Sequence, residues 1–377
     1  MTNMIEFIHP ALMNYRFELF EKLQKEYNIK FIFVMHEPQK EFGGINIPSE
    51  WNFENINLKK NSLTNWLRFV GRLLKDDYEL IIVGPAEIPY CLVTFLICKL
   101  RAKKLIAWGE GWHWSENTWY WKLYTKLLKI ILRKVDAIVA SGEKSQNFYK
   151  NILENRVEVF NIRNCVFPYK KRDPSQLIKK LAEEDSNIIN KKIVLFLSRI
   201  VRIKGLDYLI KAFKILESEL NNVYLLIVGS GDFEDYCKKL ANDLEIKNIM
   251  FRGYTSNEKE IELYYNLCDV FVLPSIFYKD SGEAIGYVVC ESMGVGKPLV
   301  VTNAVGAAPE YVKDNVNGFV VKEKNAEELY EALLKILSNE KLAKEMGEKS
   351  KETYNEKISL EKQFEAFKNV IDCFIKK

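Results

Sequence analysis

Short runs of aliphatic and β-branched residues alternate with amphipathic helical patterns along almost the whole chain. The runs are MIEFIH, KFIFVM, ELIIVG, KLIAWG and AIVASG in the first half, then IVLFLS, VYLLIVG, NIMFRG, VFVLP, PLVVT and GFVV in the second. Uninterrupted apolar strands separated by helices are typical of parallel sheets with helices on both faces. The two series therefore predict an α/β protein with two doubly wound, Rossmann-like domains.

The alternation of strands and helices breaks once, in the charged segment FPYKKRDPSQLIKKLAEEDSNIINKK, which contains two prolines. We expect a first domain over residues 1–170, a linker over 171–190 and a second domain over 191–357. The last amphipathic pattern, over 358–377, predicts a helix long enough to pack back on the first domain. A length of 377 residues exceeds one ordinary core and agrees with two domains.

Composition and charge exclude several classes of protein. An apolar content of 48% and a charged content of 28% are those of a soluble globular protein. A net charge of +4 is too small for the usual strongly basic nucleic-acid-binding protein, so we expect no nucleic-acid partner. The 7 cysteines show no CxxC pair and no Cys/His ligand spacing, which indicates a reducing cytoplasm rather than disulfides or a zinc site. Neither a signal peptide nor an apolar stretch of roughly 20 residues is visible, so we expect a cytoplasmic protein.

Two cations follow the first predicted strand of the second domain, in LFLSRIVRIKGLDYLIKAF. Arg199 and Lys204 should lie in the turn at the carboxyl edge of the sheet, where open α/β sheets bind their ligands. A helix N-terminus in that turn, together with two cations, suits a phosphate group. Gly229, after the next strand, would let a ligand approach the backbone. The alternative is a turn with two solvated surface charges.

Two acids flank an apolar run in SGEAIGYVVCES, with glycines beside the first. We expect Glu283 in the loop before a helix and Glu291 about two turns inside that helix. Carboxylates are seldom buried without a partner, so a ligand that spans both positions would explain them. The alternative is a helix-capping acid followed by an acid on the helix surface.

Taken in order, these motifs resemble the nucleotide-sugar glycosyltransferases of glycosyltransferase family 4, a large retaining family. The resemblance covers about residues 193–320, through SRxxxxKG, GSGD, FxG, PS, SGEAIGYVVCESMGVGKPLVV and GAAPE. The family pattern is Glu-Gly-Phe-Gly, a second Glu eight residues after the first, and then Gly-Lys-Pro. In this chain Ala284 replaces the first glycine of the pattern. The resemblance implies the GT-B fold, in which two facing Rossmann-like domains are separated by an interdomain cleft.

The resemblance also implies roles at an activated sugar. Arg199 and Lys204 would bind the diphosphate, Glu291 would hold the ribose hydroxyls, and Glu283 would contact the donor sugar. The donor-binding set is then Arg199, Lys204, Gly229, Glu283, Ile285, Gly286 and Glu291. Of these, Arg199, Lys204 and Glu283 form the catalytic set.

The first domain matches the family less specifically. Tyr15 and Arg16, in NYRFELFEKL, resemble the tyrosine–arginine pair that opens the first helix of many such enzymes, although the glycine-rich loop before it is missing. Glu110 and His113 lie in AWGEGWHW, where relatives often place a histidine. Either residue could orient the acceptor hydroxyl. The alternative is that both are ordinary loop residues.

No Asp-x-Asp motif for a metal-bound diphosphate occurs in the sequence, so we expect no metal and no other cofactor. The expected function is therefore retaining, metal-independent transfer of a sugar from a nucleoside-diphosphate sugar. The acceptor would be a glycan or a lipid-linked molecule in the synthesis of cell-surface polysaccharide or glycolipid. The alternatives are a GT-B nucleotide-sugar epimerase and a non-catalytic nucleotide-sugar binding protein.

Two basic, aromatic-rich helical segments of the first domain, 62–75 and 118–134, would suit an anionic membrane surface at the inner face of the cell membrane. Their basic positions are Arg68, Arg72 and Lys75 in one and Lys122, Lys126, Lys129 and Arg133 in the other. The apolar positions expected opposite them are Leu63, Trp66 and Val70, and then Tyr120, Tyr124, Leu127 and Ile131. The alternative is that both apolar faces pack on the sheet and both basic faces are only solvated.

Overall fold

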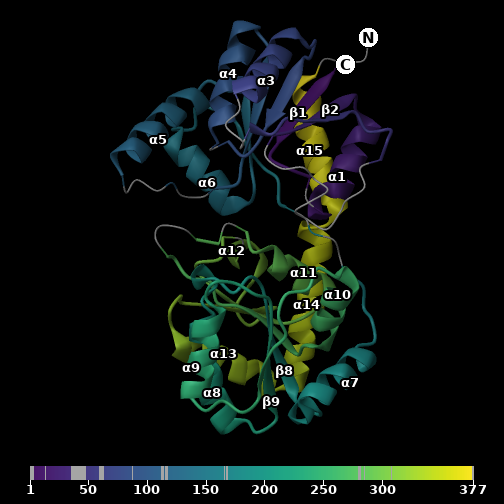
Figure 1. Cartoon of the computed structure of the whole chain (residues 1–377), viewed down its shortest axis with the longest axis vertical. Coiled ribbons are helices and arrows are strands. Elements are labelled where there is room, and N and C mark those ends of the chain that lie inside the picture. The colour runs from purple at the N-terminus through teal and green to yellow at the C-terminus, as the bar shows by residue number, and fades with distance from the viewer. Residues whose placement is uncertain are drawn as a thin grey trace. The chain divides into compact units, whose positions relative to one another are not determined.

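The computed structural model describes residues 4–12, 14–34, 48–58, 63–86, 88–111, 114, 118–164, 166, 169–278, 282–283, 285–306 and 308–375. The chain divides into two compact units (Figure 1). Unit 1 consists of Met1–Cys165 with Leu360–Lys377, and unit 2 of Val166–Ser359. Each unit contains a parallel sheet covered by helices, as the apolar runs predict.

Unit 1 is built on a sheet of seven strands in the order β3-β2-β1-β4-β5-β6-β7. The strands are β1 (Ile5–His9), β2 (Ile29–Phe33), β3 (Phe53–Asn55), β4 (Leu80–Val83), β5 (Lys104–Gly109), β6 (Ala137–Ala140) and β7 (Val159–Asn161). Neighbouring residues of one strand face opposite cores. In β1, Phe7 faces the core that contains α1 and α15, whereas Ile8 faces the core that contains α3, α4, α5 and α6. Both faces are therefore apolar.

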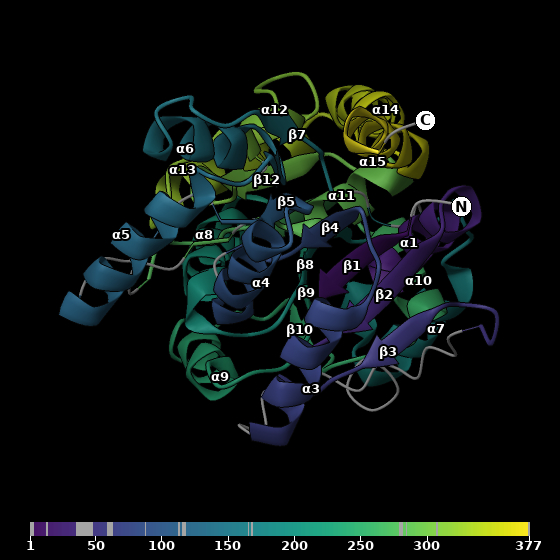
Figure 2. The same cartoon turned by 90° about the horizontal axis from the view of Figure 1, so that it is seen from above.

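The helices of unit 1 form two layers, one on each face of the sheet (Figure 2). One layer contains α3 (Leu63–Lys75), α4 (Pro89–Leu100), α5 (Trp119–Leu132) and α6 (Glu143–Ile152), and the other contains α1 (Asn14–Glu26) and α15 (Leu360–Phe374). Helix α15 packs beside α1, and its Phe367 ring lies 5.1 Å from the Trp108 ring. The C-terminal helix is thus part of the unit 1 core.

Unit 2 is built on a sheet of six strands in the order β10-β9-β8-β11-β12-β13. The strands are β8 (Lys192–Leu197), β9 (Val223–Val228), β10 (Ile249–Phe251), β11 (Val270–Leu273), β12 (Leu299–Thr302) and β13 (Gly318–Val321). The helices are α7 (Ser175–Glu184), α8 (Leu206–Glu219), α9 (Glu234–Asp243), α10 (Glu258–Leu267), α11 (Tyr287–Val295), α12 (Ala308–Tyr311), α13 (Ala326–Leu337) and α14 (Glu340–Lys357). Two 3-10 turns, Ser186–Ile188 and Arg202–Lys204, complete it.

The segment 171–190 is not the linker that its charge and prolines suggested. It contains α7 and the 3-10 turn Ser186–Ile188, and it belongs to unit 2, whose boundary with unit 1 lies at residue 165. Leu177 and Leu181, four residues apart on α7, are both buried. Arg172 makes an ion pair with the buried Glu262 of α10. The segment is thus a packed helix whose many charges lie on its solvent side.

Candidate functional site

The strand order of unit 2 reverses between β8 and β11, which are neighbours in the sheet although β9 and β10 separate them in sequence. The chain leaves these two strands in opposite directions, and open α/β sheets bind their ligands at such a point. Arg199 and Lys204 lie in the segment after β8, and Glu283 lies in the segment after β11. The sequence therefore places these three residues at the topological switch point of unit 2.

Glycine is required in the backbone of this edge. Gly205 has a φ of 63°, and an added Cβ would lie 2.0 Å from the carbonyl oxygen of Pro274 after β11. At Gly229, after β9, an added Cβ would lie 1.9 Å from the carbonyl oxygen of Ser198. The amide of Ile276 also donates a hydrogen bond to the carbonyl of Ile203, at 2.8 Å. The Gly205 approach and the Ile276 hydrogen bond hold the turn with Lys204 against the segment that follows β11, and the Gly229 approach holds the end of β9 against Ser198.

Lys204 and Glu283 form an ion pair across the switch point. Lys204 is only 8% exposed, so an unpaired ammonium group would be costly in that position. The carbonyl of Glu283 accepts a hydrogen bond from the amide of Gly306 at 2.8 Å, which fixes the acid beside the segment after β12. Arg199 is exposed and makes no ion pair within the described residues. The site thus contains one cation held by an acid and one cation in solvent.

Glu291 lies on α11, and its carboxylate accepts a hydrogen bond of 2.6 Å from the Tyr265 hydroxyl on the neighbouring helix α10. Burial raises the pKa of Glu291 to about 7, while the Tyr265 hydrogen bond acts in the opposite direction. Helix α11 begins after Gly286, which has a φ of 80°, and Ile285 before it is buried. Glu283 thus precedes the helix and Glu291 lies within it, as predicted.

Lys297 of the Gly-Lys-Pro motif has a structural role at the end of α10. Its ammonium group donates to the carbonyl oxygens of Asn266, at 2.9 Å, and Cys268, at 2.7 Å. These carbonyls lie at the C-terminal end of α10, where a cation also complements the helix dipole. Lys297 therefore holds the helix that carries Tyr265.

In unit 1 the structure brings together two of the four residues predicted on the acceptor side. Arg16 is buried, forms an ion pair with Glu110, and has its guanidinium carbon 4.0 Å from the centre of the Trp108 ring. Glu110 follows β5 at the carboxyl edge of the sheet. The side chain of Tyr15 and the whole of His113 lie outside the described residues.

Sequence reasoning missed two residues near these sites. Tyr265 supports Glu291, and His9 lies at the end of β1 with its Nδ1 atom 2.8 Å from the carbonyl oxygen of Ala11. Burial, and then the charge of Arg16, hold the pKa of His9 well below its usual range. A histidine at the carboxyl end of a buried strand is visible in the sequence. Tyr265 carries no such signal, because its contact with Glu291 joins two helices.

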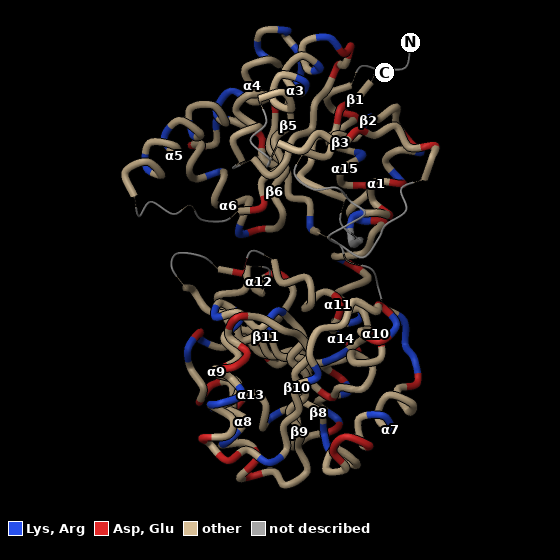
Figure 3. Tube along the Cα trace, viewed as in Figure 1, with Lys and Arg blue, Asp and Glu red and all other residues tan. Residues whose placement is uncertain are grey.

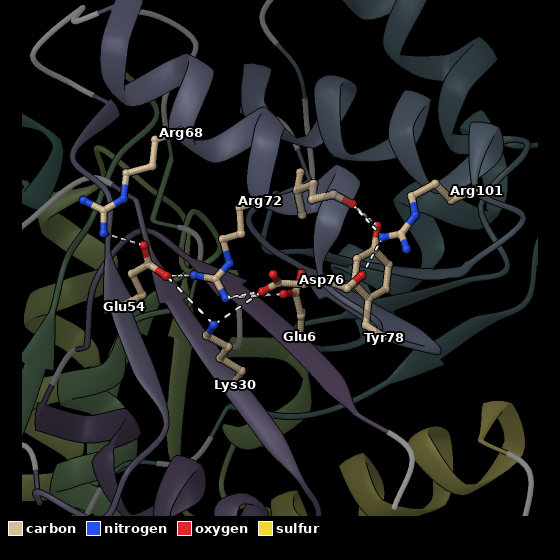
Figure 4. A network of polar contacts seen from close by, with 9 residues as sticks. Glu6, Lys30, Glu54, Arg68, Arg72, Asp76, Tyr78 and Arg101 are labelled. Carbon is tan, nitrogen blue, oxygen red and sulfur yellow. Dashed lines mark hydrogen bonds and ion pairs between the residues drawn. The ribbon is translucent and has the colours of Figure 1, made fainter. Parts of the chain in front are cut away.

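The predicted basic stripe on α3 is wrong at Arg72. Arg72 is buried and pairs with Glu54, with Asp76 at 2.8 Å and with Glu6 at 3.5 Å (Figure 4). Arg68 is 60% exposed and pairs with Glu54 at 2.6 Å, and Lys75 is exposed as predicted. The acids of this network thus remove Arg72 from the predicted surface and compensate Arg68.

The predicted faces of α5 are wrong in part. Tyr124 is half-buried and Ile131 is buried, as expected, but Tyr120 and Leu127 are 52% and 46% exposed. Thr125, Leu128, Ile131 and Leu132 make up the buried face of this helix. Arg133, at its C-terminal end, pairs with Glu154 at 2.5 Å. The outer surface of α5 is therefore apolar as well as basic.

Comparison with known proteins finds similarity to glycosyltransferases. Residues 179–353 match the family model described as Glycosyl transferases group 1. An uncharacterized glycosyltransferase of Methanocaldococcus jannaschii is 28% identical over 324 residues, which are 82% of this chain and 79% of that protein. Poly(ribitol-phosphate) alpha-N-acetylglucosaminyltransferase of Staphylococcus aureus is 24% identical over 83% of this chain and 59% of its own length.

The crystal structure of Anabaena HepE in complex with UDP superposes with a TM-score of 0.77 and 17% identity, over 98% of this chain and all of that one. The chain has the GT-B fold. The proteins that match in sequence are glycosyltransferases.

The described residues contain neither a cluster of metal ligands nor a membrane-spanning helix. No cluster of three or more His, Cys, Asp or Glu side chains there could hold a metal ion. Across the same parts of the chain, no helix combines the length and the apolar character needed to cross a membrane.

Proposed function

We propose that this chain transfers a sugar from a nucleoside-diphosphate sugar to a glycan or lipid-linked acceptor, with retention of configuration and without a metal. The observation that supports this most directly is the Lys204–Glu283 pair at the switch point of unit 2, with Arg199 in the same turn. We assign the donor to unit 2 and the acceptor to unit 1, where Arg16 holds Glu110. The proposed setting is the synthesis of cell-surface polysaccharide or glycolipid at the inner face of the cell membrane.

The proposed chemistry depends on electrostatics. The bond between the anomeric carbon and the phosphate oxygen breaks, and negative charge grows on the departing diphosphate. Arg199 and Lys204 would stabilise that charge in the transition state. The acceptor oxygen then attacks the same face of the sugar, and the departing phosphate oxygen takes its proton. No protein base is required for this route.

The Lys204–Glu283 pair also compensates a buried charge at the site. Glu283 compensates the charge of Lys204 in a turn that is nearly closed to solvent. In the proposed complex, the diphosphate provides a second anion for Lys204, and the sugar hydroxyls provide donors for Glu283. Both polar groups are then satisfied with and without the donor.

Release of free nucleoside diphosphate from a panel of nucleotide sugars, in the presence of EDTA, tests this function. A transferase should hydrolyse its own donor slowly, and adding the acceptor should give a product with the anomeric configuration of the donor. Binding of a nucleotide sugar without turnover would identify a binding protein. Release of a free sugar with altered configuration would identify an epimerase.

The two acids should separate in binding experiments. Glu291→Gln should weaken binding of free nucleoside diphosphate and of nucleotide sugar equally, since both ligands contain the ribose. Glu283→Gln should weaken binding of the nucleotide sugar by on the order of 10-fold. It should not weaken binding of the free nucleotide, because the change removes an acid that competes for Lys204. Calorimetric titration with both ligands measures this, and Glu331→Gln, at an exposed position of α13, is the control. Equal losses for both ligands in both variants would refute the division of roles.

Tyr265 should set the pH at which Glu291 becomes a carboxylate. Because the pKa of Glu291 is raised to about 7, nucleotide binding should strengthen as the pH rises through that value. Tyr265→Phe removes a hydrogen bond that favours the carboxylate, so the binding midpoint should move to higher pH. Titration of nucleoside diphosphate from about pH 5.5 to 8.5 measures this shift.

Two controls make the Tyr265 result interpretable. Tyr264→Phe changes an equally buried neighbour whose hydroxyl contacts Glu260 and Arg252 instead of Glu291. Glu291→Gln should remove the Glu291 step and leave only the titration of the nucleotide phosphate. An unchanged midpoint in Tyr265→Phe would show that the hydroxyl does not tune Glu291.

A further inference from the structure

Helix α5 presents an apolar surface to solvent. Trp119 is 77% exposed, Leu123 61% and Ile130 48%, and Leu127 and Tyr120 are similarly open. A helix packed on a sheet normally exposes polar residues on its outer side. Large apolar side chains that gather on one exposed face mark an interaction surface.

The apolar and basic residues of α5 form two adjacent strips. At 100° per residue, Trp119, Leu123, Leu127 and Ile130 fall within about 80° of one another around the helix axis. Lys122, Lys126 and Lys129 fall within about 60° and lie directly beside that strip. The opposite side of the helix carries the buried residues of its core face. We call these two strips together the α5 face.

The charge of the α5 face is not compensated. Helix α5 contains no Asp or Glu, and Figure 3 shows only basic positions among the charges along it. Within the described residues, Lys122, Lys126 and Lys129 make no ion pair. This differs from α3, where Glu54, Asp76 and Glu6 surround the buried Arg72.

The neighbouring helix α4 exposes residues of the same kinds. It contacts α5 and also contains no Asp or Glu. Its Leu96 and Leu100 are 56% and 81% exposed, and Lys99 beside them is exposed as well. The same combination of open leucines and unopposed lysine thus recurs on the adjacent helix.

We propose that the α5 face docks on an anionic lipid bilayer. The apolar strip would enter the boundary between headgroups and acyl chains, and the lysine strip would lie at the lipid phosphates. Tryptophan at the amino end of the helix is the residue type enriched at that boundary. This inference concerns unit 1 only and does not depend on the donor chemistry proposed for unit 2.

A second copy of the chain fits this face less well than a bilayer. In a symmetric dimer the same patch meets itself, so the three lysines of one copy would face those of the other. Such like-charge contacts are costly, and the helix offers no acid to offset them. A bilayer with anionic headgroups satisfies both strips at once.

Co-sedimentation with phosphatidylglycerol vesicles, and with phosphatidylcholine vesicles as the neutral reference, tests the proposal at low and high salt. The wild-type chain should prefer the anionic vesicles. Replacing Lys122, Lys126 and Lys129 by Gln should weaken this binding by on the order of 100-fold, from roughly 1 kcal/mol for each cation. Leu123→Ser with Leu127→Ser should weaken binding to the same vesicles even at high salt, where the charge attraction is screened.

The matched control removes three lysines from unit 2. Lys341, Lys344 and Lys349 of α14 are exposed, and their replacement by Gln changes the net charge equally. This variant should bind vesicles like the wild type. Quenching of tryptophan fluorescence by brominated lipids should also fall in a variant with Trp119→Phe and Trp121→Phe. Hydrolysis of a soluble nucleotide sugar should be unchanged in all of these variants.

Three outcomes would overturn the proposal. The first is equal binding to anionic and neutral vesicles at low salt. The second is a loss of vesicle binding in the α14 control as large as the loss in the α5 lysine variant. The third is a dimer without lipid that Leu123→Ser and Leu127→Ser dissociate, which would assign the face to a protein interface. Loss of donor hydrolysis in every protein, wild type included, would instead count against the proposed function.

Discussion

Lys204→Ala should lower turnover of the best donor by on the order of 100-fold or more. In the proposed mechanism the ammonium group of Lys204 stabilises charge that appears on the diphosphate only as the bond to the sugar breaks. Its loss should therefore reduce kcat more than it weakens donor binding. Arg199→Ala should act in the same direction. Steady-state rates of nucleoside diphosphate release give both parameters.

The Lys204–Glu283 contact demands a second variant. Removing the lysine alone leaves Glu283 unpaired in a mostly buried position, and that stranded charge could itself repel a diphosphate. A double variant, Lys204→Ala with Glu283→Ala, separates the two causes. Because Glu283 is itself assigned to the donor sugar, the readout for the double variant is binding of free nucleoside diphosphate, which lacks that sugar. If Lys204 binds the diphosphate, the double variant binds it as weakly as the single one. If the stranded acid is responsible, binding returns in part, and the assignment of Lys204 is wrong.

Lys211→Ala provides the matched control, since Lys211 is an exposed lysine on α8, the helix that follows the Lys204 turn. It should turn over the donor like the wild type. Activity of Lys204→Ala within a factor of about three of wild type would remove the phosphate role from this residue.

The sequence predicted the fold and the positions of the site residues along it, because both leave local signals. Buried parallel strands give continuous apolar runs, and ligand-binding residues follow such strands at one edge of the sheet. The positions of Arg199, Lys204 and Glu283 after β8 and β11 could therefore be predicted before any contact was known. The Lys204–Glu283 pair could not, because it depends on which strands are neighbours.

Two of the wrong predictions share one cause. On a helical wheel Arg72 lies on a basic face of α3, but its partner Glu6 is on strand β1 and its partner Glu54 is on β3. These tertiary contacts bury Arg72. The segment 171–190 was similar, since its charge and prolines suggested a linker while Leu177 and Leu181 bury one side of α7. Local composition does not show which polar face meets a partner.

Arg72→Leu should destabilise unit 1 by about 3–5 kcal/mol, the usual cost of removing one member of a buried ionic network. Arg72 is the centre of that network, in contact with Glu6, Glu54 and Asp76 (Figure 4). Without it, Glu6 is a fully buried acid with no cation in contact. Urea unfolding followed by tryptophan fluorescence measures the loss, because all 7 tryptophans lie between residues 51 and 121, in unit 1.

Arg68→Leu is the control, since Arg68 pairs with the same Glu54 but its side chain is 60% exposed. It should cost about 1 kcal/mol or less. Equal losses in the two variants would show that the Arg72 network adds nothing beyond an ordinary surface ion pair.

The pH dependence of stability should identify Glu6 as the source of the penalty. Burial raises the pKa of Glu6 from 4.5 to about 7, with Arg72 lowering it and Asp76 raising it further. The native state therefore binds this proton more tightly than the unfolded state, and stability should fall as the pH rises from about 4.5 to 7. Each pKa unit corresponds to about 1.4 kcal/mol, so this loss is on the order of 3 kcal/mol.

Arg72→Leu should raise the pKa of Glu6 still more, so the variant should be much closer to wild-type stability at about pH 5 than at about pH 8. Adding Glu6→Gln to Arg72→Leu should flatten the pH dependence of the free energy of unfolding. It should also restore part of the stability at high pH, because the neutral amide requires no cation. Unfolding curves of the wild type, both single variants and the double variant across that range make a complete cycle. If the double variant is as unstable as Arg72→Leu at every pH, the lost packing of the arginine side chain explains the effect, and the charge of Glu6 does not.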